Sequence, residues 1–106
     1  MAAALINTRR SADGGVVVEV RGEIDFETSG RLRDILVDAA SRLMPIRVVV
    51  DLLHVTFIDS TGIGALAAGR NTAHQVGIDF TLRHPGPFVT ERLRQIGLYD
   101  TLVGDA

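Results

Sequence analysis

The run of residues 46–52, Ile-Arg-Val-Val-Val-Asp-Leu, constrains the fold more than any other segment of the chain. Its valines and isoleucine are β-branched, and such residues favour a strand. Apart from Arg47 and Asp51 every side chain in the run is apolar, which is typical of a strand that is buried on both faces. We therefore expect this segment to be a central strand of a sheet.

Two other segments also predict strands. Residues 16–20 are mostly valine and have glycines near both ends, while residues 79–83 alternate polar and apolar side chains. Residues 5–8 are expected to pair with residues 16–20 across a turn at residues 13–15, Asp-Gly-Gly. This hairpin would place an antiparallel strand at the N-terminal edge of the sheet.

Residues 32–43 predict an amphipathic helix, because apolar side chains recur there at spacings of three and four residues. The apolar face consists of Leu32, Ile35, Leu36, Ala39, Ala40 and Leu43. We expect Thr28 or Ser29 to cap the start of this helix, and Pro45 to close its end.

A C-terminal helix is predicted after Pro85 and Pro87, which end the preceding strand. Its expected buried face consists of Phe88, Val89, Leu93 and Ile96. Gly97 suits the left-handed conformation that often ends a helix, and Leu98 is placed for the hydrophobic contact beyond it.

A loop over residues 53–59 is expected to lead into a further helix, which starts near Ser60 and ends before Gly77. The elements then follow the order ββαβαβα. Strands that are separated by helices must be parallel. The sequence therefore predicts a single small α/β domain over residues 1–106, with its core at about 5–103. Its sheet is mixed and mostly parallel, with an antiparallel N-terminal edge and helices packed on it.

Composition narrows the class of protein. A chain of 106 residues that is 46% hydrophobic suits one folded domain rather than a disordered segment. The absence of cysteine excludes a disulfide framework, a thiolate metal site and a cysteine nucleophile. A formal net charge of -2 offers no basic surface for direct nucleic-acid binding. Without a long apolar stretch or a signal segment, we expect a cytoplasmic protein that does not contact the membrane.

The most informative stretch is residues 55–66, VTFIDSTGIGAL, which connects the central strand to the following helix. Asp59, Ser60 and Thr61 place side-chain oxygens at the start of that helix. These residue types are the ordinary N-caps, so capping alone can explain them. The second interpretation is that a hydroxyl is exposed at the end of a central strand, where open α/β sheets bind ligands.

The helix that follows is rich in small residues, including Gly62, Gly64 and Gly69. A glycine inside a helix costs roughly 1 kcal/mol relative to alanine, so another interaction must compensate. The candidates are close packing of the helix on the sheet and close approach of a partner backbone. Residues 62–67 also match a dinucleotide-binding pattern, but the strand ends too far before them for that site.

Other chemistries have weaker support. Ser60 lacks the preceding glycine that a nucleophile elbow requires. No ligand spacing connects the histidines, which are His54, His74 and His84. A metal site would need three separated carboxylates to converge, namely Asp25, Asp51 and Asp59. We therefore predict no catalytic residue, no metal and no cofactor.

Taken together, these residues resemble the STAS domain of anti-sigma-factor antagonists. The resemblance lies in GEID at residues 22–25, in FIDSTGIG at residues 57–64 and in RLRQIGLY at residues 92–99. It covers the chain from roughly residue 5 to residue 103. The run from Asp59 to Gly64, in its setting between a strand and a helix, is its most specific part.

The resemblance implies a mechanism. In this family the serine after the aspartate is phosphorylated, and here that residue is Ser60. The kinase is the anti-sigma factor itself, an ATP-using serine kinase. The unphosphorylated antagonist binds it and releases the sigma factor, and a metal-dependent serine phosphatase resets the switch. The antagonist is thus a substrate and a binding partner, not an enzyme. The implied phosphosite loop and partner interface comprise Asp25, Asp59, Thr61, Gly62, Ile63 and Gly64.

Two alternatives remain open. The family also contains STAS domains that are never phosphorylated and act as scaffolds or as transporter-associated subunits. The intact Asp59, Ser60 and Thr61 favour the phosphorylation switch over that function. A small nucleotide-binding enzyme is the other possibility, but the sequence contains neither a convincing phosphate cradle nor a catalytic pair.

Overall fold

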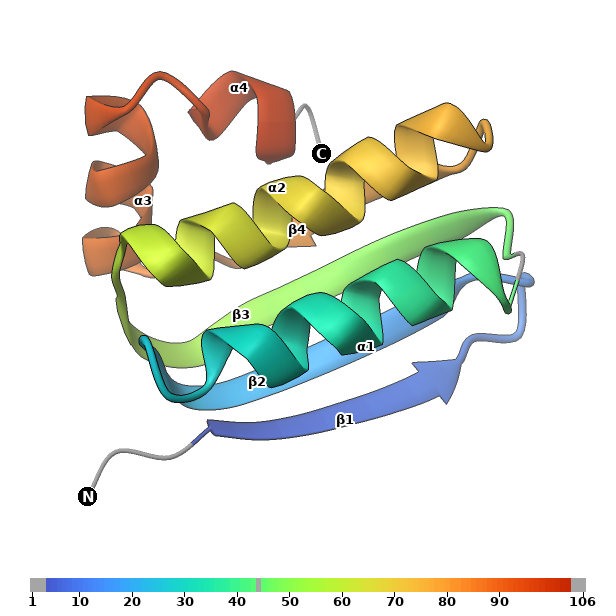
Figure 1. Ribbon diagram of the computed structural model, residues 1–106, viewed down its shortest axis with the longest axis horizontal. Coiled ribbons are helices and arrows are strands. Elements are labelled where there is room, and N and C mark those ends of the chain that lie inside the picture. The colour runs from blue at the N-terminus through green and yellow to red at the C-terminus, as the bar shows by residue number, and fades with distance from the viewer. Residues whose placement is uncertain (1–3, 44, 104–106) are drawn as a thin grey trace.

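The computed structural model describes residues 4–43 and 45–103, and these residues form one mixed sheet and four helices (Figure 1). The strands, in their order across the sheet, are β1 (Ala4–Arg10), β2 (Val16–Ile24), β3 (Arg47–Ile58) and β4 (Asp79–Arg83). β1 is antiparallel to β2, whereas β2, β3 and β4 run parallel. The predicted α/β fold with an antiparallel N-terminal edge is therefore confirmed, and β3 has a neighbour on each side.

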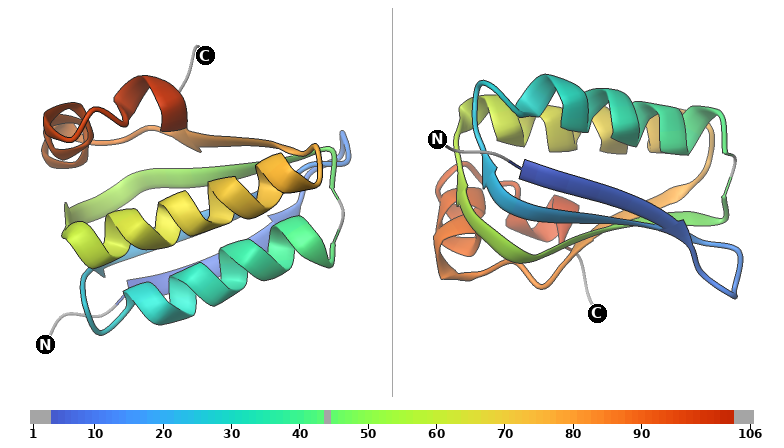
Figure 2. Two further views of the ribbon diagram at one scale, coloured as in Figure 1. Left: turned by 45° about the horizontal axis from the view of Figure 1, so that its top comes forward. Right: turned by 90° about the horizontal axis from the view of Figure 1, so that it is seen from below.

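Two long helices, α1 (Ser29–Ser41) and α2 (Ser60–Gln75), lie side by side on one face of the sheet (Figure 2). Two shorter helices, α3 (Pro87–Gln95) and α4 (Tyr99–Leu102), lie on the other side of the sheet, near the β4 edge. Much of the sheet face opposite α1 and α2 is therefore not covered by a helix.

The core lies between the sheet and the two long helices. Alternate valines of β2 and β3 are buried there, because successive side chains of a strand point to opposite faces. α1 contributes the face that its sequence pattern predicts. Its buried residues include Leu32, Leu36, Ala39 and Ala40, and Ile35 and Leu43 pack at the margin.

β3 is longer than the sequence indicates. The loop predicted over residues 53–59 is wrong, because the strand continues to Ile58. Polar and exposed residues such as His54 and Thr56 break the apolar pattern there, yet the backbone stays paired with β2. The pairing contains register shifts between Glu19 and Arg21 and between Gly22 and Glu23, which accommodate the irregular pattern.

The start of α1 also differs from expectation. Thr28 occupies the N-cap position, but its side chain makes no capping hydrogen bond. The Thr28 hydroxyl instead accepts a bond from the Asp25 N–H at 3.0 Å and donates to the Glu23 carbonyl at 2.9 Å. It therefore stabilises the loop that precedes the helix.

α3 starts at Pro87 as predicted, but only half of its expected apolar face is buried. Val89 and Leu93 are inside, whereas Phe88 is 40% exposed and Ile96 is 46% exposed. The Phe88 ring packs at the surface against Phe57, with ring centroids 5.3 Å apart. The aromatic partner explains why Phe88 does not enter the core.

The end of α3 follows the predicted geometry. Gly97 has a φ of 75°, and the Leu98 N–H donates to the Leu93 carbonyl at 2.9 Å. These contacts form a Schellman motif. The short helix α4 follows and was not anticipated by the sequence pattern. Its single turn is tied to Leu98 by a bond from the Leu102 N–H at 3.0 Å.

In residues 4–43 and 45–103, none of the helices has the length and apolarity needed to cross a membrane.

Candidate functional site

Two loops meet at the edge where the parallel strands β2 and β3 end. Ile24 and Ile58, the last residues of these strands, are paired in the sheet. The loop after β2 leads into α1, and the loop after β3 leads into α2. A hydrogen bond of 3.2 Å from the Asp59 N–H to the Ile24 carbonyl joins the two loops.

Asp59 caps α2, which confirms the structural interpretation of this residue. One of its carboxylate oxygens accepts bonds from the N–H groups of Thr61 at 2.9 Å and Gly62 at 3.1 Å. The Thr61 hydroxyl donates to the same oxygen at 2.5 Å. This hydroxyl contributes most to lowering the pKa of Asp59, partial burial opposes it, and the Gly62, Thr61 and Phe26 N–H groups lower the pKa further. Asp59 is therefore an anion at neutral pH.

Ser60 is the first residue of α2, and it is exposed. Within the described part of the chain its hydroxyl makes no hydrogen bond, in contrast to the Thr61 hydroxyl beside it. The Asp59 carboxylate already occupies the N–H groups of Thr61 and Gly62, but the dipole of the helix N-terminus still favours an added anion at this position. The Ser60 hydroxyl is therefore accessible, and the backbone around it is held by the Asp59 capping bonds.

The glycines of α2 fall into two groups. A Cβ on Gly62 would lie 2.7 Å from side-chain carbons of both Ile24 and Ile58, and a Cβ on Gly69 would lie 2.8 Å from Leu36. Close packing therefore explains these two positions. A Cβ on Gly64 would meet nothing within 4 Å, so packing inside the chain gives no reason for that glycine.

The predicted interface residues do not all reach the surface. Gly62 is buried, and Ile63 is only 7% exposed because it packs into the core. Both support the loop from within. Thr61 and Gly64 are exposed, on the same first turns as Ser60.

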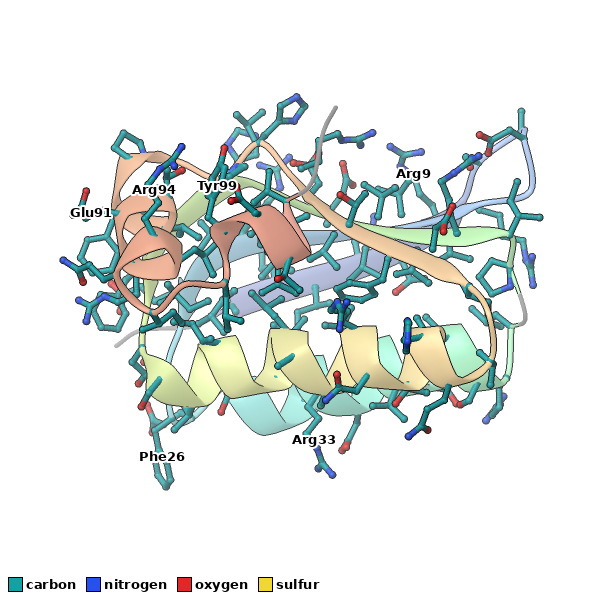
Figure 3. The ribbon with its side chains drawn as sticks, turned by 90° about the horizontal axis from the view of Figure 1, so that it is seen from above. Arg9, Phe26, Arg33, Glu91, Arg94 and Tyr99 are labelled. Carbon is teal, nitrogen blue, oxygen red and sulfur yellow. The ribbon has the colours of Figure 1, made fainter. Side chains whose placement is uncertain are left out.

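The loop before α1 adds a residue that the sequence reasoning missed. Asp25 accepts a hydrogen bond from the Glu27 N–H at 3.0 Å, so its carboxylate folds back on its own loop. Phe26, between these two acidic residues, is 80% exposed and points away from the body of the domain (Figure 3). The available signal was an aromatic residue between two acids, in the segment between the predicted strand at residues 16–20 and the predicted helix at residues 32–43.

The three carboxylates considered for a metal do not converge. Asp51 contacts Arg83 and His84, each at 3.5 Å, away from the loops. Burial raises its pKa, but the Leu53 N–H, the charge of Arg83 and the contact with His84 together outweigh that effect and lower it. Among residues 4–43 and 45–103 there is no group of three or more side chains able to hold a metal.

Comparisons with known proteins identify relatives of the chain. The chain is 28% identical over 86 residues to the anti-sigma F factor antagonist of Paenibacillus polymyxa, covering 81% of this chain and 74% of that protein. An anti-sigma factor antagonist from Mycobacterium paratuberculosis has a similar structure, with a TM-score of 0.83, 28% identity, and coverage of 94% of this chain and 83% of that one.

The fold also occurs in a sulfate transporter family protein from Wolinella succinogenes. That structure has a TM-score of 0.73 at 22% identity, covering 89% of this chain and 75% of that chain. The model of the STAS domain matches residues 6–104. The chain therefore belongs to the STAS domain family.

Proposed function

We propose that this protein is an anti-sigma-factor antagonist that is switched by phosphorylation of Ser60. In its unphosphorylated form it binds an anti-sigma factor that is an ATP-using serine kinase, and the sigma factor is released. A metal-dependent serine phosphatase restores the binding form. The protein is then a substrate and a partner rather than an enzyme, and we assign it no catalytic residue, metal or cofactor.

The observation that carries this proposal is the state of the Ser60 hydroxyl. It is exposed at the first position of α2, while Asp59 holds the surrounding backbone through bonds to Thr61 and Gly62. A kinase needs a hydroxyl that it can reach without unfolding the substrate. The name of the Paenibacillus polymyxa relative, an anti-sigma F factor antagonist, supports the same function.

The surface around Ser60 suits a protein partner. Gly64 lies one helical turn after Ser60, and the empty space above it lets a partner backbone approach α2 closely. Phe26 projects from the neighbouring loop, and exposed aromatic residues often anchor protein interfaces. We therefore place the partner across the starts of α1 and α2.

Electrostatics explain how one phosphate can act as a switch. Phosphorylation adds about 1.5 to 2 negative charges. A dianion about 6 Å from one partner carboxylate costs roughly 1.4 kcal/mol at the dielectric constant of water, and roughly 5 kcal/mol at a dielectric constant near 20. Because about 1.4 kcal/mol is a tenfold change in affinity, charge alone weakens binding by about one to four decades.

The effect of phosphate falls on the interface rather than on the fold. A helix N-terminus tolerates an anion, so α2 is expected to stay folded after phosphorylation. Circular dichroism of the phosphorylated and unphosphorylated protein should therefore give the same helix content.

Binding measurements on Ser60 variants test the proposal. Ser60→Ala is expected to bind the kinase about as tightly as the wild type. Ser60→Asp is expected to bind about three- to 100-fold more weakly, because aspartate brings one negative charge where phosphate brings up to two. Asn71→Asp, which adds the same charge at an exposed position of α2 far from its first turn, is the matched control and should bind like the wild type. Equal affinities of Ser60→Ala and Ser60→Asp, by isothermal titration calorimetry, would contradict the proposed switch.

A second candidate is a STAS domain that is never phosphorylated and acts as a scaffold or a transporter-associated subunit. The likeness to the Wolinella succinogenes sulfate transporter family protein favours keeping it. The two functions differ in one outcome. The scaffold predicts partner binding that is insensitive to charge at Ser60.

A further inference from the structure

The sheet face opposite α1 and α2 carries a groove far from the Ser60 loop. Its volume is about 290 Å³, which lies at the lower end of the range for ligand-sized cavities. Arginines from three strands line it, Arg9 of β1, Arg47 of β3 and Arg83 of β4. In Figure 3 the Arg9 side chain lies on the side of the sheet away from α1 and α2, and Phe26 lies toward the opposite end.

The sheet register explains why these side chains meet. Arg9 is paired with Val17, and Val17 is paired with Val49, so the three side chains share one face. Arg47 lies on that face because it is two positions before Val49 in the same strand. Arg83 lies next to Asp51, which is two positions after Val49. The arginines therefore surround a floor made of two valines.

The floor is covered although no helix packs on it. Val17 is 5% exposed and Val49 is 9% exposed. The aliphatic stems of long cationic side chains can cover apolar surface in this way while the charged ends stay in water. A covering role alone, however, does not require the guanidinium groups to be held in place.

Two of the three guanidinium groups are held. Arg47 forms an ion pair with Asp13. The Ser11 hydroxyl and the Gly15 N–H donate to Asp13 and lower its pKa to about 2, so this partner stays charged. Arg83 lies 3.5 Å from a carboxylate oxygen of Asp51.

Some of the arginine donors that line the groove have no partner among the described residues. Arg9 forms no ion pair with the described residues, and the buried Nε of Arg83 has no hydrogen-bond partner among them. Three arginines and one carboxylate, Asp13, line the groove of a chain whose formal net charge is -2. The local charge is thus opposite in sign to that of the whole molecule.

We propose that this groove binds a small phosphate-bearing anion whose apolar body lies against the arginine stems over Val17 and Val49. Guanidinium groups on several sides suit a tetrahedral phosphate with several terminal oxygens better than a planar carboxylate. The site is separate from the Ser60 loop, so it does not depend on the proposed phosphorylation switch.

Phenyl phosphate is the probe, because it combines a phosphate with a flat apolar body. Titration into protein with ¹³C-labelled valine methyl groups should give saturable shifts of Val17 and Val49. Arg9→Gln should weaken binding by about tenfold, the loss expected for one charged hydrogen bond. Arg33→Gln is the matched control. It removes the same charge from an exposed position on α1 (Figure 3) and should leave the affinity unchanged.

Three outcomes would overturn the proposal. The first is the absence of saturable shifts at Val17 and Val49, and the second is equal affinity of Arg9→Gln and Arg33→Gln. The third is benzoate or inorganic phosphate binding as tightly as phenyl phosphate, because the phosphate and the valine floor would then not act together. Arg47→Gln is the second variant if Arg9→Gln fails to fold. Ser60→Ala should bind phenyl phosphate like the wild type, which separates this test from that of the switch.

Discussion

The loops before α1 and α2 begin alike and differ in what they expose. Each follows a buried strand end and contains an aspartate, then hydroxyl residues, then a helix. Before α1, Thr28 and Ser29 are each only 8% exposed, and the Thr28 hydroxyl is bonded within the loop. Before α2, Asp59 makes the capping bonds and Ser60 remains outside.

Hydroxyl residues at one edge of a sheet are therefore not equivalent. Thr28 and Ser29 are inaccessible, and the Thr61 hydroxyl is engaged with Asp59. Ser60 alone among these four combines exposure with a hydroxyl that is not bonded within the described residues. The α1 loop instead exposes Phe26. We infer a division of roles in which one loop anchors the partner and the other carries the switch.

The largest expected effect tests the anchor. Phe26→Ala should weaken binding to the kinase partner by about 30-fold or more, the effect of losing a hot-spot aromatic residue of about 2 kcal/mol. Leu53→Ala is the control, because Leu53 is also exposed, at 57%, but lies within β3 rather than in either loop. Equal affinities of the two variants by titration calorimetry would contradict the proposal that Phe26 anchors the partner.

The next effect tests the contact between the loops. A Cβ on Gly62 would lie 2.8 Å from the Ile24 carbonyl oxygen, whereas a Cβ on Gly30, near the start of α1, would meet nothing within 4 Å. Gly62→Ala should destabilise the fold by about 1–3 kcal/mol through overpacking. Gly30→Ala should stabilise it by up to about 1 kcal/mol. Urea unfolding measures both, and similar values would contradict the close approach.

A third pair compares the engaged threonines. Thr28→Val removes a buried hydroxyl and leaves the Asp25 N–H and the Glu23 carbonyl without this partner, at an expected cost of about 1–3 kcal/mol. Thr61→Val removes an exposed hydroxyl whose bond to Asp59 is weakened by the surrounding water, so the expected cost is smaller, about 0.5–1 kcal/mol. If thermal unfolding shows that Thr61→Val loses more stability than Thr28→Val, the prediction is contradicted.

The smallest effect is the pH dependence of the Asp59 cap. The pKa of Asp59 is lower in the folded protein than its ordinary 3.8. Its stabilisation is therefore fully present above pH 3.8 and is lost as pH falls through the lower, folded value. Asp59→Ala should cost about 1 kcal/mol at neutral pH, and this difference should shrink in acid. Asp59→Asn is the control, because asparagine caps a helix without titrating. A difference in stability between wild type and Asp59→Ala that does not change with pH would contradict the charged cap.

The sequence predicted the parts of the fold that depend on regular patterns. The valine runs and the spacing of Leu32 and Leu36 identified strands and helix, because burial imposes these periods. It failed at β3, where pairing with β2 sustains the strand through exposed residues such as His54. It also failed at Phe88, whose partner Phe57 is distant in sequence.

The candidate site also contains features that the sequence predicts and features that it does not. Asp59 as a cap follows from local chemistry, and the sequence was sufficient for it. The exposure of Phe26, the burial of Ile63 and the separate reasons for Gly62 and Gly64 depend on neighbours from other elements. Three-dimensional contacts were needed to tell which residues of the motif face a partner and which support it.

Intact-mass spectrometry after incubation with ATP and the cognate anti-sigma factor serine kinase tests whether Ser60 is the residue that is phosphorylated. We expect one added phosphate on the wild type, located at Ser60 by fragmentation, retained in Thr61→Val and absent in Ser60→Ala. No added phosphate, or a phosphate located at Thr61, Thr28 or Ser29, would contradict the assignment of Ser60 as the switch.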